Sequence, residues 1–140
     1  MFSKMIKKMQ AKIGGESGFT LIELLVVIII IAILAAIAIP MYLAQRKKGY
    51  KSQMYSDLQN AAVAEESYYT SHGSYAIGTN AVVVPLLQAE GFKPTTGVTL
   101  GPFTSTGGGT TYTIAAVHAS YGGCTVTYDS ATGAPTDSCT

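Results

Sequence analysis

The most prominent pattern in the sequence is a long uncharged run near the N-terminus. No charged residue occurs from Leu24 to Gln45, and the segment Leu24–Ile39 contains only Leu, Val, Ile and Ala. As a helix, this run is roughly 33 Å long, which matches the apolar core of a bilayer. Since the run is apolar on all sides and longer than most buried core helices, it predicts a membrane-spanning helix.

The pattern becomes amphipathic beyond the uncharged run. Apolar residues then recur at spacings of three and four, at Tyr50, Met54, Leu58, Ala61 or Ala62, and Tyr68. Polar residues occupy much of the other surface, at Gln45, Lys48, Ser52, Asp57 and Glu66. We therefore predict one helix from about Phe19 to Ser71, weakly interrupted at Gly49 and closed at His72–Gly73 by a glycine cap. At about 80 Å it exceeds ordinary helices of small globular proteins and indicates assembly.

Residues 73–140 have a different composition, rich in Gly, Thr and Ser. We expect a short helix over 85–90 after the apolar stretch 81–84. Strands are expected over 98–103, 112–118 and 124–128, with turns at 107–109, 122–123 and 129–133. The predicted fold class is α+β: a long N-terminal helix, half of it transmembrane and half packed on a small antiparallel sheet.

Charge favours an orientation and excludes two classes of protein. Residues 1–18 carry a net charge of +3 and the remainder −2. A basic N-terminal arm stays in the cytoplasm, so the bulk of the chain should lie outside, although Arg46, Lys47, Lys48 and Lys51 on the far side oppose this assignment. A net charge of +1 with 48% hydrophobic residues excludes a disordered chain and a basic nucleic-acid module.

The two cysteines, Cys124 and Cys139, are compatible with export. In an oxidising compartment they would form a disulfide that closes a loop and stabilises the fold by about 3 kcal/mol. The alternative is two free buried thiols. His72 and His118 show no metal-ligand spacing with them, and no nucleophile motif or phosphate-binding loop is present. We therefore predict no catalytic residue, no metal site and no cofactor, and expect a protein that is not an enzyme.

Glu23 directly precedes the apolar run and helps to distinguish a membrane-spanning helix from a cleavable signal. A cleavable secretory signal is one alternative, since Ala36–Ala38 has the form of an A-x-A site. The apolar stretch is too long for that, and an ionisable group beside lipid indicates function. The simpler explanation is an acid that stabilises the helix N-terminus through the dipole.

The residues Gly18-Phe19-Thr20-Leu21-Ile22-Glu23, after a Lys-rich leader and before the apolar run, resemble the class III signal of type IV prepilins and of the pseudopilins of type II secretion. Pro40 and Tyr42 also stand where that family often has them. The resemblance covers roughly residues 14–69, and beyond them it is one of architecture.

The resemblance implies a set of site residues. The prepilin peptidase would cut between Gly18 and Phe19, and Phe19 would become the N-methylated terminus. Glu23 would pair with the amine of a neighbouring subunit, with Thr20 also serving assembly. Pro40 would mark where the packed helix bends or loses helicity. The Cys124–Cys139 bridge would take the place of the family's C-terminal disulfide region.

The resemblance also implies a domain plan: a cleaved leader over 1–18, a transmembrane and filament-core helix over 19–45, its amphipathic half over 46–72, and a β-rich head over 73–140. The leader is longer than in many such pilins, which leaves the pilin subclass open.

The function implied is that of a structural subunit of a type IV pilus used for motility, adhesion or DNA uptake. Its partners would be further copies of itself, the prepilin peptidase, the assembly platform and minor pilins. It would lie in the inner membrane first and in an extracellular filament later.

Two alternatives remain at this stage. One is a major pseudopilin, whose head typically holds calcium, although Asp129 and Asp137 are few ligands for that ion. The other is an exported soluble protein cut near Ala38.

Overall fold

The structure is a computed structural model that describes residues 18–139. The predicted leader, residues 1–18, lies outside the described residues except for Gly18. The chain divides into two compact units, the first ending at Tyr42 and the second beginning at Leu43. Each unit is described by itself.

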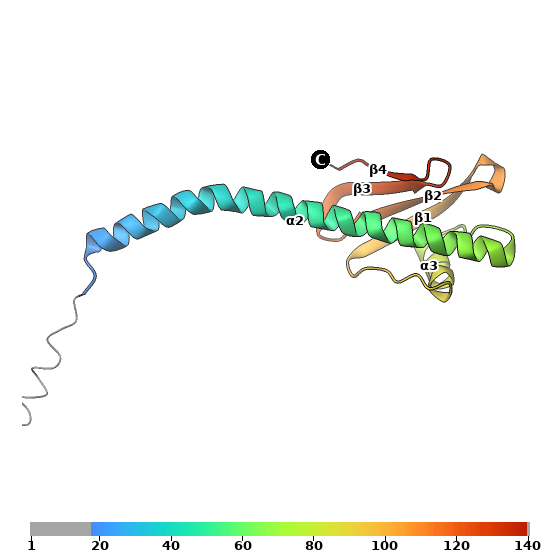
Figure 1. The fold of residues 1–140 in the computed structure, drawn as a ribbon, viewed down its shortest axis with the longest axis horizontal. Coiled ribbons are helices and arrows are strands. Elements are labelled where there is room, and N and C mark those ends of the chain that lie inside the picture. Colours follow the sequence, from blue (N-terminus) through green and yellow to red (C-terminus); the bar gives the residue numbers. More distant parts are fainter. Residues whose placement is uncertain (1–17, 140) are drawn as a thin grey trace, which may run out of the picture. The chain divides into compact units, whose positions relative to one another are not determined.

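The helix α2, Leu21–His72, contributes to both units (Figure 1). It continues through Pro40 and Gly49, so helicity is retained at both residues. It ends at His72 because Gly73 adopts a φ of 72° and donates its N–H to the Tyr69 carbonyl at 2.7 Å. The predicted helix and its glycine cap are confirmed.

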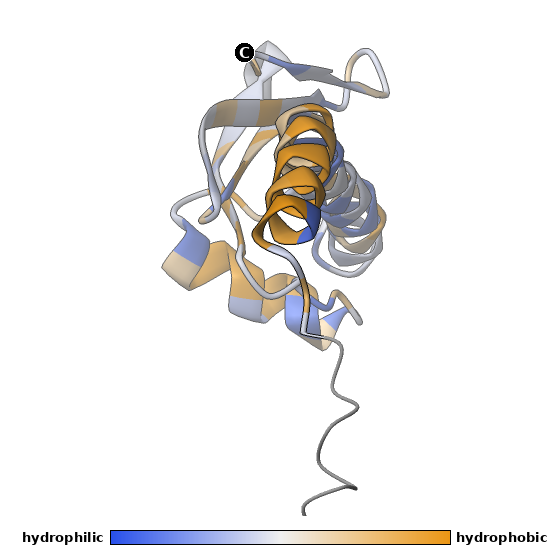
Figure 2. Cartoon of the chain, turned by 90° about the vertical axis from the view of Figure 1, so that its left-hand side faces the viewer, coloured by the Kyte–Doolittle hydropathy of each residue, from blue (hydrophilic) through white to orange (hydrophobic). Residues whose placement is uncertain are grey.

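In the first unit the side chains of α2 are exposed all round. The large apolar side chains from Leu21 to Met41 are 42–84% exposed. Figure 2 shows this part of the helix as an apolar cylinder. By length and composition, α2 is the one helix among residues 18–139 that could cross a membrane.

The second unit contains a four-stranded antiparallel sheet in the order β1-β2-β3-β4. Its strands are β1 (Val98–Thr106), β2 (Thr111–His118), β3 (Tyr121–Asp129) and β4 (Ala134–Asp137). The predicted turn at 107–109 is the short 3₁₀ helix η1, Gly107–Gly109, between β1 and β2. The α+β fold class is confirmed.

One core joins the helices of this unit to the sheet. Buried side chains come from the helix residues Met54 and Leu58, and from Phe103, Ile114 and Val126 of the first three strands. The inward residues of β2 alternate with more exposed ones, as a sheet with one covered face requires. The amphipathic part of α2 therefore packs within its own head.

The second helix, α3 (Asn80–Ala89), begins earlier than predicted. The expected start near Pro85 was wrong, since the apolar stretch 81–84 is already helical. Thr79 precedes the helix, and its carbonyl accepts the N–H groups of Val82 and Val83, both at 3.0 Å. Val83 and Leu87 lie four positions apart on one face and are fully buried, so packing favours the longer helix.

The connection between β2 and β3 also differs from the prediction. The turn is at Ala119–Ser120, while Gly122 and Gly123 lie within β3. The register shifts between Val117 and His118, so that three β3 residues, 122–124, have no partner on β2. Gly123 adopts a φ of 78° there, so these glycines serve a β-bulge rather than a turn.

The C-terminal segment contains a strand where only a tail was expected. Residues 130–133 form the predicted turn, in which the Asp129 side chain accepts the Ala131 N–H at 2.8 Å. The following β4 pairs with β3, with Thr127 opposite Thr136. The alternating segment Cys124–Tyr128 is confirmed as a strand.

Candidate functional site

The N-terminus of α2 is closed by a reciprocal cap formed by Thr20 and Glu23. The Thr20 N–H and hydroxyl both donate to Glu23 Oε2 at 2.8 Å. In return, the Glu23 N–H donates to the Thr20 hydroxyl oxygen at 3.2 Å. This is a capping box, in which each side chain satisfies a backbone donor that the first turn leaves free.

The cap agrees with the simpler explanation for Glu23, an acid that stabilises the helix N-terminus. Thr20 provides two donors to its carboxylate. The pattern Thr-x-x-Glu before an apolar run is itself a capping signature and could have identified this pair. Only Oε2 is occupied, and Glu23 Oε1 accepts no hydrogen bond from residues 18–139. The carboxylate can therefore accept a further donor without losing its cap.

Gly18 and Phe19 precede the helix and are exposed. The Phe19 side chain is 90% exposed. Together with Ile22, Glu23, Val26 and Val27 it lines an apolar groove of about 380 Å³. The peptide bond between Gly18 and Phe19 thus lies outside the helix, between two exposed residues.

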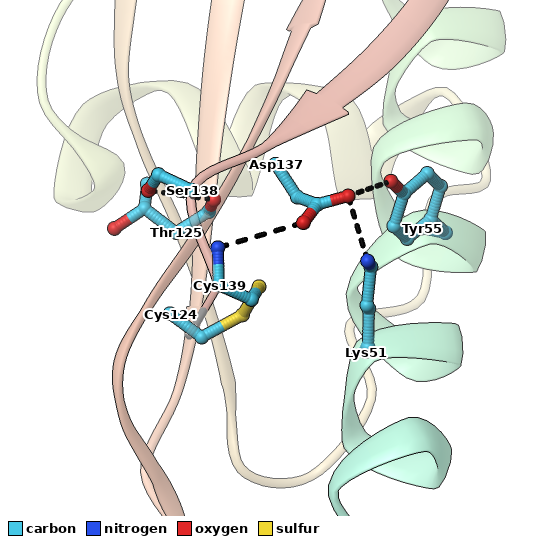
Figure 3. The surroundings of a disulfide bond; sticks show 7 residues. All are labelled: Lys51, Tyr55, Cys124, Thr125, Asp137, Ser138 and Cys139. Atoms are coloured by element: carbon cyan, nitrogen blue, oxygen red, sulfur yellow. Dashed lines mark hydrogen bonds and ion pairs between the residues drawn. A yellow bond between two sulfur atoms is a disulfide. The ribbon is translucent and has the colours of Figure 1, made fainter.

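At the other end of the chain, a disulfide joins Cys124 to Cys139 (Figure 3). The predicted bridge therefore connects β3 to the C-terminal tail. Beside it, the Ser138 N–H donates to the Thr125 carbonyl at 3.0 Å. The tail is thus fixed to β3 covalently and by its backbone.

Asp137 attaches the same tail to α2. Its Oδ2 forms an ion pair with Lys51 Nζ at 2.7 Å and accepts the Tyr55 hydroxyl at 2.7 Å (Figure 3). Hydrogen bonds from Lys51 and Tyr55 lower the pKa of Asp137, because they favour its charged form. The C-terminal region is therefore linked to both the sheet and the helix.

Two carboxylates of α2 are buried against the loops of the head, which the sequence did not reveal. Asp57, expected on the solvated face, is 1% exposed and accepts the Thr95 N–H at 2.7 Å and the Thr95 hydroxyl at 2.6 Å. Glu65 is fully buried and accepts the Ala76 N–H at 3.0 Å. Its Oε1 has no hydrogen-bond partner in the described part of the chain, and burial raises the pKa of Glu65 to about 7. Both side chains connect the helix to loops distant in sequence.

The two histidines lie in aromatic contacts. His118, a β2 residue, stacks on Tyr50 with ring centroids 4.2 Å apart, and His72 stacks on Tyr68 at 4.0 Å. Within residues 18–139, no group of three or more His, Cys, Asp or Glu side chains could hold a metal ion.

Comparison with known proteins places the N-terminal features in a family context. Residues 14–39 match the family described as the prokaryotic N-terminal methylation motif. The matched segment contains Gly18, Phe19, Thr20 and Glu23 and the whole of the apolar segment Leu24–Ile39.

Relatives extend the similarity beyond the motif. The type IV wide pilus major component PilA4 of Thermus thermophilus is 44% identical over 69 residues, covering 49% of this chain and 53% of that protein. The fimbrial protein EcpC of Eikenella corrodens is 38% identical, covering 54% of this chain and 65% of that protein. The type IV major pilin protein PilE1 of Neisseria gonorrhoeae is 42% identical, covering 43% of this chain and 36% of that protein. The chain thus spans about half the length of the first of these relatives.

The resemblance to type IV pilins is therefore confirmed. It rests on the methylation motif and on relatives named as pilins and fimbrial proteins. These names favour the pilus subunit over the pseudopilin. The motif and the exposed apolar helix also fit a membrane-anchored prepilin that later enters a filament.

Proposed function

We propose that this chain is a structural subunit of a type IV pilus that polymerises through the N-terminal part of α2. The observation that carries the proposal is the helix segment within the methylation motif, whose large apolar side chains are exposed on every side. Such a surface needs lipid or other helices around it. A filament built from many copies supplies the second environment.

Processing is the first step of the proposed mechanism. The prepilin peptidase cuts between Gly18 and Phe19, which removes the leader 1–18, and Phe19 is then N-methylated. The apolar run begins at Leu24, so cleavage leaves the membrane anchor in place. The new amine at Phe19 is a cation four positions before the Glu23 carboxylate.

Pairing between subunits is the second step. The Glu23 carboxylate keeps its Thr20 cap and accepts the Phe19 amine of a neighbouring copy at its free oxygen, Oε1. In an apolar filament core, an unpaired charge is strongly disfavoured, so this contact fixes the register of one helix against the next. Thr20 acts by holding the Glu23 side chain in one orientation.

Transfer from membrane to filament is the third step. The uncharged segment within residues 19–45 leaves lipid and enters a bundle of identical segments, so its apolar surface stays covered throughout. Pro40 lacks a backbone N–H and crowds the preceding turn, so it marks where the packed helix can bend. Residues 46–72 and 73–140 form the head displayed outside this bundle.

The proposed partners follow from these steps. They are further copies of the chain, the prepilin peptidase, the assembly platform and minor pilins. The chain serves as building material rather than as an enzyme, first in the inner membrane and then in an extracellular filament for motility, adhesion or DNA uptake.

Mass spectrometry of the major subunit in sheared surface filaments tests the proposal. We expect this chain, with N-methylated Phe19 as its first residue. A mature chain beginning at Ile39 would instead indicate a secreted soluble protein. Processed Phe19 in the membrane together with absence from filaments would favour a pseudopilin.

A further inference from the structure

We propose that Arg46, Lys47 and Lys48 form a basic collar that binds the phosphates of anionic phospholipids at the membrane surface. The proposal rests on the proposed function, because it requires the preceding helix segment to span a membrane. The collar would hold the unassembled subunit at a fixed depth.

The position of the collar in the sequence is the first argument. The uncharged run ends at Gln45, and Arg46, Lys47 and Lys48 follow it directly. With Lys51, they make up four of the five basic residues outside residues 1–18. If the run spans the bilayer, these side chains emerge at the level of the lipid headgroups. The charge of the leader does not explain why these cations lie on the far side of the membrane. Binding to lipid headgroups at that depth would explain it.

The state of the cations is the second argument. Within residues 18–139, the salt bridge between Lys51 and Asp137 is the only one, and Figure 3 shows Lys51 directed at that carboxylate. Arg46, Lys47 and Lys48 are exposed and have no carboxylate partner in the described part of the chain. The collar therefore presents three uncompensated charges.

The surroundings of the collar are the third argument. The Arg46 guanidinium lies 5.5 Å from the centre of the Tyr50 ring, and Lys47 Nζ lies 5.5 Å from that of Tyr121. Tyrosine is enriched where proteins meet the headgroup region, since its ring is apolar and its hydroxyl polar. The collar thus combines the two residue types that anchor proteins at this depth.

A groove beside the collar has the lining that a glycerophosphate group requires. Its volume is about 210 Å³, and Leu43, Arg46, Lys47, Tyr50 and Ser120 line it. Leu43 offers an apolar wall, while the two cations and the hydroxyl groups offer charge and hydrogen bonds to phosphate oxygens.

A second copy of the chain is a poorer source of anions for the collar. All seven acidic side chains outside residues 1–18 already accept at least one hydrogen bond within their own chain. They are Glu23, Asp57, Glu65, Glu66, Glu90, Asp129 and Asp137. Two of these, Asp57 and Glu65, are also buried. Lipid phosphates are the anions present at this depth in large number.

The test compares two variants of the full chain that change net charge equally. Wild type, Lys47→Gln and Lys93→Gln are reconstituted in phosphatidylcholine vesicles containing a minority of phosphatidylglycerol. Native mass spectrometry of the released protein then gives the ratio of the two bound lipids. Lys93 is an exposed lysine outside the collar and serves as the matched control.

We expect phosphatidylglycerol to be enriched on the wild type above its share of the vesicle. Lys47→Gln should reduce that enrichment about five-fold, the effect of one basic residue at an anionic surface, and Lys93→Gln should leave it unchanged. Binding of both lipids in vesicle proportions, or equal losses in the two variants, would overturn the collar.

Two further arms identify other outcomes. A short oligonucleotide that binds the chain in neutral vesicles with the same dependence on Lys47 would replace lipid by nucleic acid as the ligand. A chain that is washed from vesicles of either composition would overturn the proposed function as well, whereas a retained chain without lipid preference overturns the collar alone.

Discussion

Residues 21–42 and residues 43–72 continue the same helix, but their side chains meet different surroundings. In the first segment, Ile29 and Leu34 are 49% and 61% exposed, and such values recur along its length. In the second, Met54 and Leu58 are fully buried against the head. The first segment presents an apolar surface that residues 18–139 do not cover, whereas the second completes a core with the head.

The difference separates the requirements for assembly from those for folding. Substitutions near Glu23 should change what the first segment does with other copies and leave the head folded. Substitutions in the head should change its stability and affect filaments only through unfolding. Each prediction below tests whether that separation holds, beginning with the largest effect.

Glu23→Ala should have the largest effect. It removes the acceptor for a neighbour's amine and leaves that amine unpaired in an apolar surrounding, a change of about 3–5 kcal/mol for each buried contact. We expect membrane insertion and cleavage as in wild type, and a large loss of filaments. The measurement is the yield of sheared filaments relative to processed subunit in the membrane. Normal yield would refute the pairing role.

Thr20→Val separates the cap from the pairing. It keeps the size of the side chain and the Glu23 carboxylate but removes the hydroxyl that exchanges hydrogen bonds with Glu23. Loss of an N-cap costs about 1 kcal/mol, so we expect fewer filaments than in wild type but more than with Glu23→Ala. A yield as low as that of Glu23→Ala would show that the hydroxyl is as important as the carboxylate.

Opening the disulfide should affect the head alone. Cys124→Ser with Cys139→Ser removes a bridge between residues 15 positions apart, which stabilises by about 3 kcal/mol in the chain-entropy model. We expect a lower Tm of the full chain in detergent, with peptidase cleavage unchanged. An unchanged Tm would mean that β4 and the contacts of Asp137 hold the tail without the bridge.

The parts of the fold that sequence predicts are those with a regular period. The spacing of Tyr50, Met54 and Leu58 indicates the buried face of α2. The alternation of apolar and polar residues indicates the strand that contains Cys124 and Val126. The motif Gly18–Glu23 identifies the candidate site because its order is specific.

The parts that sequence does not predict depend on contacts across the fold. Asp57 and Glu65 are polar, and a sequence pattern would place them on the exposed face. In the fold both side chains are buried, and their carboxylates accept hydrogen bonds from the Thr95 N–H and the Ala76 N–H. Those donors are 38 and 11 residues away, and no local pattern identifies them. The same limit applies to Gly122 and Gly123. Two consecutive glycines are compatible with a turn or with a β-bulge, and only the register of the facing strand decides between them.

Glu65 gives the head a pH dependence. Its pKa is about 7 in the folded chain and 4.5 ordinarily, so between these values the folded state binds more protons than the unfolded state. Stability should therefore fall as pH rises from about 4.5 to 7, by roughly 1–3 kcal/mol. Chemical denaturation of wild type and Glu65→Gln at pH 5 and pH 8 checks this. Subtracting the change in unfolding free energy between the two pH values in Glu65→Gln from that in wild type removes the contributions of other titrating groups.

Glu65→Gln should lose this slope, because the amide stays neutral and its oxygen can still accept the Ala76 N–H. The adjacent Glu66 also raises the pKa of Glu65, so Glu66→Gln should reduce the slope partially. Parallel pH profiles for wild type and Glu65→Gln would show that Glu65 stays charged in the folded head.

The ion pair between Lys51 and Asp137 should give the smallest effect, because both side chains remain partly in water, at 34% and 25% exposure. The pKa of Asp137 is lowered in the folded chain, so the contribution of the contact is present above its ordinary value of 3.8 and is lost as pH falls through the folded value. Lys51→Met should therefore lower Tm slightly at pH 6, less than the disulfide variant does, and the difference from wild type should vanish in acid. High salt should reduce it as well. A loss at pH 6 as large as that from the double serine variant would mean that Lys51 contributes as much to the attachment of the tail as the disulfide does.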